Sequence, residues 1–258
     1  MKYLSVVAVL KDEALNLREW LDFHRAVGVE HFYLYDNGST DNTKELCEEY
    51  EDITYSYNTM DMCQMSCYFN AVTAYRDQSR WMAFIDLDEF LYSPKGDLKE
   101  QLKGFEQFPG IAVNEVFYGS NGHETRPPDG VLVNYTKRRK AVDKHVKSIC
   151  QPALTLCSAF NPHSFIYTQG MAVNENKQQC PGPFNEPATA DIFRINHYWV
   201  KSKEEYKTKL TRGRADVPSR DPQFRYTTGV GRKLDEVFKQ DNEIEDTEIW
   251  KFLERKHG

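Results

Sequence analysis

The chain has 258 residues, which is the length of one large domain or two small ones and is sufficient to bury a core without disulfides. Its content of 40% hydrophobic and 28% charged residues excludes a disordered or fibrous protein. The 33 basic and 39 acidic residues give a formal net charge of −6, which excludes a generally basic nucleic-acid-binding surface.

Residues 1–105 alternate between strand and helix patterns. The apolar run Leu4–Leu10 predicts a parallel strand that is buried on both faces. A helix is predicted after it, with Asp12 as the N-terminal cap and Gly28 at the end. Later strands are predicted at 32–35, 53–57 and 81–85, and helices near 45–47 and 64–76. This alternation indicates βαβ units and therefore an α/β fold with a parallel sheet.

The second half of the chain has weaker patterns. Residues 174–190 contain turn residues and little periodicity, which is typical of a long functional loop. The basic run Lys137–Lys140 is expected to form a solvated surface. Strands are predicted at 111–118, 131–135 and 192–199, and helices at 203–210 and 247–255. No repeat or linker divides the sequence, so we expect a single domain over residues 1–258.

Polar clusters follow three of the predicted strands directly. They are Lys11–Glu13, Asp36–Asn37 and Asp86–Glu89. Ligands of open α/β sheets bind at the carboxyl ends of the strands, where these clusters are expected to meet. The three clusters together predict one ligand-binding site at this edge of the sheet.

The strongest candidate for a metal site is the Asp-x-Asp element formed by Asp86 and Asp88, with Glu89 beside it. Two carboxylates in a turn can converge on one divalent cation, and oxygen ligands suit Mg²⁺ or Mn²⁺. Three carboxylates held together after an apolar strand would be costly without a neutralising charge. A divalent cation that also binds phosphate oxygens is therefore expected here.

Several segments match a known family in the family's own order. They are Val9–Glu13 with Glu19–Leu21, Tyr35–Asp41, Gln64 with Asn70, Ile85–Leu91, Phe117–Gly122 and Ile195–Ser202. On these segments the sequence resembles the family 92-like glycosyltransferases of the GT-A fold, which are related to family 2. The resemblance covers about residues 3–215.

The resemblance implies a GT-A (Rossmann-like) fold, with a mixed, mainly parallel sheet flanked by helices. It implies inverting transfer of a hexosyl or deoxyhexosyl group from a nucleoside diphosphate-sugar, with UDP as the expected nucleotide, to a saccharide or glycan acceptor. The expected cofactor is Mn²⁺ or Mg²⁺. We expect a nucleotide-binding half at 1–105, an acceptor-binding half at 106–215 and a C-terminal helical extension at 216–258.

The resemblance also implies roles for individual residues. The metal ligands would be Asp86, Asp88 and His197, with Asp86 shared between the metal and the ribose. Asp36 would hold the nucleotide base. The residues expected to line the same nucleotide site are Lys11, Glu13, Asn37, Gln64 and Asn70.

The charge of the phosphates requires basic partners, and Lys147 and Arg212 are the candidates. Inverting transfer also requires a general base for the acceptor hydroxyl. The candidate bases all lie in the second half of the chain, and they are Asp191, Glu115, Asp143 and Glu186. We place Asp191 first, because it opens the segment leading to His197, and Glu115 second.

Two other functions are compatible with parts of this pattern. A nucleotidyltransferase also uses a metal and a nucleotide, but the segment after the first strand, Leu10–Ala14, lacks the expected glycines. A sugar-binding module without catalysis would fit the aromatic content of 13%, but it would leave the Asp-x-Asp pair and His197 unused.

The sequence contains no apolar run near the roughly 18 residues of a membrane span. The longest run, Leu4–Leu10, is too short and too soon followed by charges to be a signal peptide. The six cysteines are scattered without metal-ligand spacing and are expected to be reduced. These features predict a cytoplasmic protein.

Overall fold

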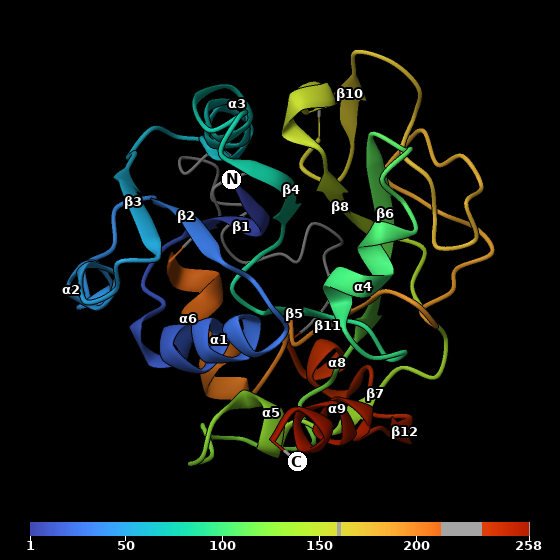
Figure 1. The fold of residues 1–258 in the computed structure, drawn as a ribbon. Coiled ribbons are helices and arrows are strands. Elements are labelled where there is room, and N and C mark those ends of the chain that lie inside the picture. Colours follow the sequence, from blue (N-terminus) through green and yellow to red (C-terminus); the bar gives the residue numbers. More distant parts are fainter. Residues whose placement is uncertain (159–160, 213–233, 258) are drawn as a thin grey trace.

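A computed structural model describes residues 1–158, 161–212 and 234–257 of the chain (Figure 1). Its strands are β1 (Lys2–Leu10), β2 (His31–Asp36), β3 (Ile53–Tyr57), β4 (Ser79–Phe84), β5 (Glu89–Tyr92), β6 (Gly110–Phe117), β7 (Lys137–Arg138), β8 (Val146–Cys150), β9 (Thr155–Ser158), β10 (Phe165–Tyr167), β11 (Arg194–His197) and β12 (Ile244–Glu245). Its helices are α1 (Ala14–Ala26), α2 (Thr43–Glu48), α3 (Gln64–Ala74), α4 (Leu98–Lys103), α5 (Val131–Asn134), the 3₁₀ turn η1 (Pro152–Leu154), α6 (Lys203–Arg212), α8 (Leu234–Lys239) and α9 (Glu248–His257).

Eight strands form one mixed sheet in the order β3-β2-β1-β4-β8-β6-β11-β5. The first four of these strands are parallel. Strand β8 runs antiparallel to both β4 and β6, and β11 is parallel to β6. The carboxyl ends of β1, β2, β4, β6 and β11 therefore lie at one edge of the sheet, together with the amino end of β8. This arrangement confirms the predicted α/β fold with a mixed, mainly parallel sheet.

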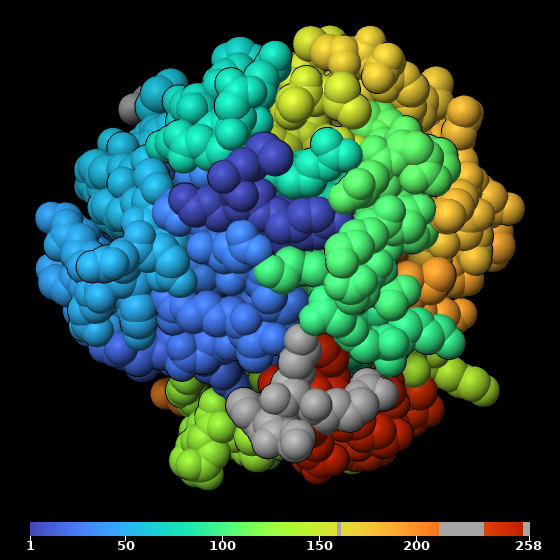
Figure 2. Space-filling view, in the orientation of Figure 1, coloured from blue at the N-terminus to red at the C-terminus, as the bar shows by residue number. Residues whose placement is uncertain are grey.

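Helices cover both faces of the sheet because alternate residues of the central strands point to opposite sides. Leu4, Val6 and Ala8 pack in one cluster with residues of α1, whereas Val7 packs in a second cluster with residues of α3. Figure 2 shows the blue and cyan segments of the first half packed beside the green and yellow segments of the second half. The two clusters hold the carboxyl edge of the sheet in place.

Two local predictions are wrong. Asp12 does not cap α1, because its carboxylate accepts hydrogen bonds from the backbone N–H and the hydroxyl of Thr40. Residues 131–134 form the helix α5 and not a strand. The carboxylate of Glu19 accepts from the backbone N–H groups of Val131 and Leu132, and so caps this turn from outside the segment. A pattern of apolar residues contains no information on such a distant cap.

In the basic run, Lys137 and Lys140 are exposed as expected, whereas Arg138 and Arg139 are partly buried. Arg138 forms an ion pair with Asp246 at 2.5 Å, and Arg139 forms ion pairs with Asp143 and Asp241 at 2.5 and 2.7 Å. These contacts fix the C-terminal segment to the sheet. Among the described helices, none combines the length and the apolar composition that a membrane span requires.

Candidate active site

The turn after β4 places three carboxylates at the carboxyl edge of the sheet. Strand β5 begins at Glu89 and pairs antiparallel with β11, so that Glu89 lies opposite His197. The backbone N–H of Tyr198 donates to the carbonyl of Asp88 at 2.8 Å and holds the turn against β11. The pairing of β5 with β11 therefore brings the late histidine to the Asp-x-Asp turn.

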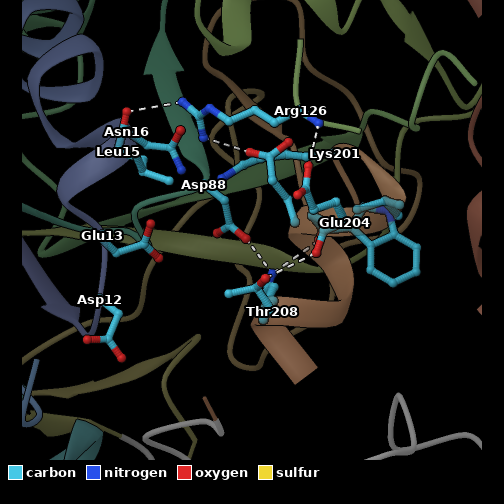
Figure 3. A pocket seen from close by; sticks show the side chains of 13 residues that line it. Asp12, Glu13, Leu15, Asn16, Asp88, Arg126, Lys201, Glu204 and Thr208 are labelled. Carbon is cyan, nitrogen blue, oxygen red and sulfur yellow. Dashed lines mark hydrogen bonds and ion pairs between the residues drawn. The ribbon is translucent and has the colours of Figure 1, made fainter. Parts of the chain in front are cut away.

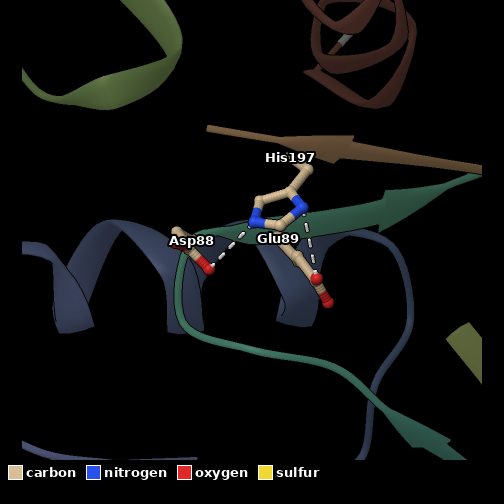
Figure 4. Close-up of side chains that lie close together, drawn as sticks. All are labelled: Asp88, Glu89 and His197. Carbon is tan, nitrogen blue, oxygen red and sulfur yellow. Dashed lines mark ion pairs between the residues drawn. The ribbon is translucent and has the colours of Figure 1, made fainter. Parts of the chain in front are cut away.

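His197 lies between two of these carboxylates (Figure 4). Its Nε2 is 3.6 Å from Asp88 Oδ1, and its Nδ1 is 3.6 Å from Glu89 Oε1. One ligand atom from each of these three residues lies within 4.8 Å of the other two. Asp88 and His197 were predicted as metal ligands. Glu89 was not, because the strand that orients its side chain was not predicted.

The charges of this group are buried. Burial alone would lower the pKa of His197, but Asp88, Glu115 and Glu89 raise it to about 10. Burial also raises the pKa of Glu89 well above its usual value. Glu89 Oε1 and His197 Nδ1 are buried and form no hydrogen bond among the described residues, although Lys147 Nζ lies 3.2 Å from Glu89 Oε1. Because unsatisfied buried oxygen and nitrogen ligands favour a bound cation, these residues fit a divalent metal ion.

Asp86 lies beside this group and has other partners. Lys147 Nζ contacts Asp86 Oδ2 at 2.6 Å and Glu89 Oε1 at 3.2 Å, and the lysine side chain is only 2% exposed. Gln64 donates to Asp86 Oδ1 at 3.2 Å. The structure thus brings three predicted nucleotide-site residues together, but it places Asp86 in contact with Lys147 and not within the group formed by Asp88, Glu89 and His197.

The ends of β1 and β2 are adjacent, with Leu10 paired to Asp36. Asp36 is 1% exposed, and both of its carboxylate oxygens already accept hydrogen bonds, from Ser39 N–H and from Tyr55 OH, each at 2.7 Å. Asn37 donates to the carbonyl of Asn58 at 2.8 Å. Each oxygen of Asp36 already accepts one hydrogen bond. A nucleotide base that donates to Asp36 would therefore have to share one of these oxygens with Ser39 or Tyr55.

The other predicted nucleotide-site residues lie around the same edge. Lys11 follows β1, and Glu13 is 5% exposed at the start of α1. Asn70 lies on the exposed side of α3, where its Oδ1 accepts from Tyr35 OH at 2.7 Å. Arg212 is the last residue of α6, and its side chain lies outside the described residues.

A pocket opens between the start of α1 and α6, and Asp88 forms part of its wall (Figure 3). Lys209 of α6 also lines this pocket. Its Nζ lies 2.5 Å from Asp88 Oδ2 and 3.2 Å from the carbonyl oxygen of Trp199. Burial opposes ionisation of Asp88, but Lys209 and His197 hold the pKa of this carboxyl well below its usual range. A second lysine of the same wall, Lys201, is 9% exposed, and neither lysine was predicted as a site residue.

The predicted general bases are scattered. Glu115 is 2% exposed, and its Oε1 lies 3.5 Å from His197 Nδ1. Asp191 is exposed and precedes β11, so it lies toward the end of that strand opposite to His197. Glu186 is exposed and lies 3.5 Å from Lys144, whereas Asp143 contacts His145 and Arg139. Of the two preferred candidates, only Glu115 contacts the Asp88–Glu89–His197 group.

A comparison with known protein families shows which family the chain belongs to. The family model of glycosyltransferase family 92 matches residues 5–252, which include the turn after β4 and His197. The chain belongs to glycosyltransferase family 92. The resemblance to this family that the motifs indicated is therefore confirmed.

Curated relatives of this family 92 chain are plant proteins. A family 92 protein of Oryza sativa subsp. japonica is 28% identical over 217 residues, which is 81% of this chain and 35% of the relative. One of Arabidopsis thaliana is 27% identical over 228 residues, covering 81% of this chain and 37% of the relative. The chain thus spans little more than a third of the length of these relatives.

Two solved structures are similar to this chain at low sequence identity. TarS 1–349 of S. aureus in complex with UDP-GlcNAc has a TM-score of 0.42 and 14% identity, and the match covers 82% of this chain and 65% of that chain. The 4-diphosphocytidyl-2C-methyl-D-erythritol synthase of Anaerococcus prevotii has a TM-score of 0.35 and 14% identity, covering 60% of this chain and 72% of that chain.

Proposed function

We propose that this chain catalyses metal-dependent, inverting transfer of a hexosyl or deoxyhexosyl group from a UDP-sugar to a saccharide or glycan acceptor. The observation that carries the proposal is the buried group of Asp88, Glu89 and His197 at the carboxyl edge of the sheet. Ligands of α/β sheets bind at this edge, and the site combines oxygen and nitrogen ligands for a cation with a buried lysine.

The residues of this group would hold Mn²⁺ or Mg²⁺. When bound, the cation supplies Lewis-acid stabilisation of the negative charge that develops on the leaving diphosphate. Lys147 contributes a fixed positive charge, since its contacts with Asp86 and Glu89 raise its pKa well above the usual value although burial opposes this. Asp86, which accepts a hydrogen bond from Gln64, holds Lys147 at the position where the donor phosphates are expected.

The nucleotide would lie along the ends of β1, β2 and β4. Lys11, Asp36 and Asn37 lie at the ends of the first two of these strands, and Asp86 lies just after the third. The expected UDP would place its base toward Asp36 and its diphosphate toward Asp88. The acceptor would then approach from the second half of the chain, across β8 and β6.

Binding of the nucleotide tests this proposal first. Titration calorimetry with UDP should show binding that depends on Mn²⁺ in the wild type and is lost in Asp88→Asn. Removal of one charged ligand from a buried site is expected to weaken metal-dependent binding by at least about 10-fold. Asp191→Asn, an exposed change toward the far end of β11, is the matched comparison. Undiminished Mn²⁺-dependent binding of UDP by Asp88→Asn would contradict the metal assignment.

The products distinguish transfer from other chemistry. A panel of UDP-sugars with Mn²⁺ and water as the acceptor should release UDP slowly. Release of pyrophosphate from UTP and a sugar phosphate would instead indicate a nucleotidyltransferase. Binding of UDP-sugars without any release, in the presence of saccharide acceptors, would indicate a binding module.

A further inference from the structure

His145, which is not among the predicted site residues, lies at the same edge of the sheet. His145 Nδ1 is 2.6 Å from Asp143 Oδ1, and the backbone N–H of His145 donates to the same oxygen at 3.0 Å. Arg139 pairs with the other oxygen of Asp143 at 2.5 Å. Burial opposes ionisation of Asp143, but His145 and Arg139 lower the pKa of its carboxyl.

These contacts determine which ring nitrogen carries the proton. An ionised carboxylate only accepts hydrogen bonds, so Nδ1 of His145 must donate to Asp143. In the neutral ring the lone pair then lies on Nε2. This nitrogen has no hydrogen-bond partner among residues 1–158, 161–212 and 234–257, and the side chain is 42% exposed. His145 is thus oriented as a proton acceptor with access to solvent.

The register of the sheet places His145 beside the candidate active site. His145 immediately precedes β8, whose amino end lies at the carboxyl edge of β4 and β6. The pairing of β6 with β8 continues to His145, because Glu115 N–H donates to its carbonyl at 3.2 Å. Since side chains alternate along strands, His145, Lys147 and Glu115 share one face of the sheet.

The distance from the metal-binding group suits a sugar between them. Strand β6 alone separates β8 from β11, which makes two strand spacings across the sheet. His145 lies opposite Glu115 of β6, whereas His197 lies opposite Phe117, two residues further along the strand. The backbones of the two histidines are therefore roughly 12 Å apart. The exposed ring of Phe184 lies edge-on to His145 with a centroid distance of 4.8 Å. An apolar ring of this kind offers a surface for the C–H face of a saccharide.

We propose that His145 is the general base of glycosyl transfer and that Asp143 is the residue that positions it, an inference that rests on the proposed function. The acceptor hydroxyl gives its proton to His145 Nε2 as its oxygen bonds to the anomeric carbon of the donor. The bond from that carbon to the diphosphate oxygen breaks, and its electron pair leaves with UDP. The half-exposed imidazolium then returns the proton to solvent.

The surrounding charges support this role. The hydrogen bond to Asp143 raises the pKa of His145, burial opposes this, and the nearby charge of Glu115 adds to the increase while that of Lys144 reduces it. A stabilised imidazolium strengthens the neutral ring as a base. Glu115, in contrast, is buried against His197, and Asp191 lies toward the opposite edge of the sheet. The dyad is therefore better placed than either preferred carboxylate.

Chemical rescue tests the base directly in the full chain. Release of UDP from a UDP-sugar with Mn²⁺ is measured for wild type, His145→Ala, Asp143→Asn, the double variant and His123→Gln as a control histidine change. We expect His145→Ala to lower kcat by about 10²–10⁴-fold with unchanged affinity for UDP and Mn²⁺ by calorimetry. Added imidazole should restore part of the rate in His145→Ala and should leave the rate of the wild type unchanged.

Asp143 has its own signature in the same assay. Asp143→Asn should lower kcat and leave KM for the donor unchanged, and it should add little to the loss in the double variant, because the two residues act as one unit. Normal turnover by His145→Ala, a parallel loss of UDP binding, or a loss that imidazole does not restore would overturn the dyad. A wild type that binds UDP but turns over no UDP-sugar would overturn the proposed function itself, and the dyad with it.

Discussion

At the scale of single residues, the site is a set of buried charges that neutralise one another. Asp88 contacts His197 on one side and Lys209 on the other, so the lysine already supplies a positive charge to the carboxylate. A divalent cation bound to Asp88 must compete with this ammonium group. We therefore expect the Lys209 contact to lower the affinity of the site for a metal ion in the absence of the nucleotide.

Replacing Lys209 tests that competition. Lys209→Met keeps the length of the side chain and removes its charge, so Asp88 loses a charged hydrogen-bond partner of the kind that contributes about 1.5–3 kcal/mol. The affinity for Mn²⁺ alone, measured by calorimetry, should increase by about 10-fold or more. Lys207→Met changes an exposed lysine of the same helix and serves as the control. Equal affinities in the two variants would show that Lys209 does not compete with the cation.

At the scale of secondary structure, the elements are stabilised by residues that lie far away in the sequence. Helix α5 has four residues and follows Gly130, whose φ of 88° is accessible to glycine and strained for other residues. A helix this short depends on its cap. The cap is Glu19 of α1, which accepts from Val131 and Leu132 N–H at 2.6 and 2.9 Å.

Glu19→Gln should therefore destabilise the fold. The amide retains one acceptor but loses the charge that pairs with the amino end of α5, and we expect a loss of about 0.5–2 kcal/mol in the free energy of unfolding. Glu49→Gln, which breaks an exposed ion pair with Arg18, is the control and should cost less than about 1 kcal/mol. Urea denaturation measures both. An equal effect of the two changes would mean that the cap contributes no more than a surface pair.

At the scale of the whole molecule, the C-terminal segment is joined to the sheet by buried ion pairs. Asp246 accepts from Arg138 at 2.5 Å and from Arg194 of β11 at 2.8 Å, and its side chain is 10% exposed. Burial opposes its ionisation, but Arg194 and Arg138 lower its pKa to about 2. The same strand carries His197, so this contact also supports the candidate active site.

The low pKa of Asp246 predicts how stability depends on pH. An aspartate has a pKa of about 3.9 in the unfolded chain, so the stabilising contribution is complete above this value and decreases as the pH falls toward 2. Asp246→Asn should lose about 3–5 kcal/mol at pH 7, because it leaves the buried Arg194 and the partly buried Arg138 without their charged partner. The difference from wild type should shrink as the pH falls below 4, as measured by urea denaturation. A difference that stays constant between pH 7 and pH 3 would contradict the assignment.

The sequence by itself determined much of the fold and part of the site. The helices and strands of residues 1–105 were predicted close to their observed bounds, except β5 and α4, because their periodicity is a local property. The Asp-x-Asp turn, His197 and the family also followed from motifs. Each of these features depends on residues that are close together in the chain, so it can be recognised from the sequence alone.

Only the tertiary structure decided which side chains meet. Glu89 joins Asp88 and His197 because β5 pairs with β11, and Lys147 reaches Asp86 because β8 lies beside β4. The same pairing of strands places the His145–Asp143 dyad at the edge where the site lies. Contacts between distant segments depend on strand order and register, which local periodicity does not encode.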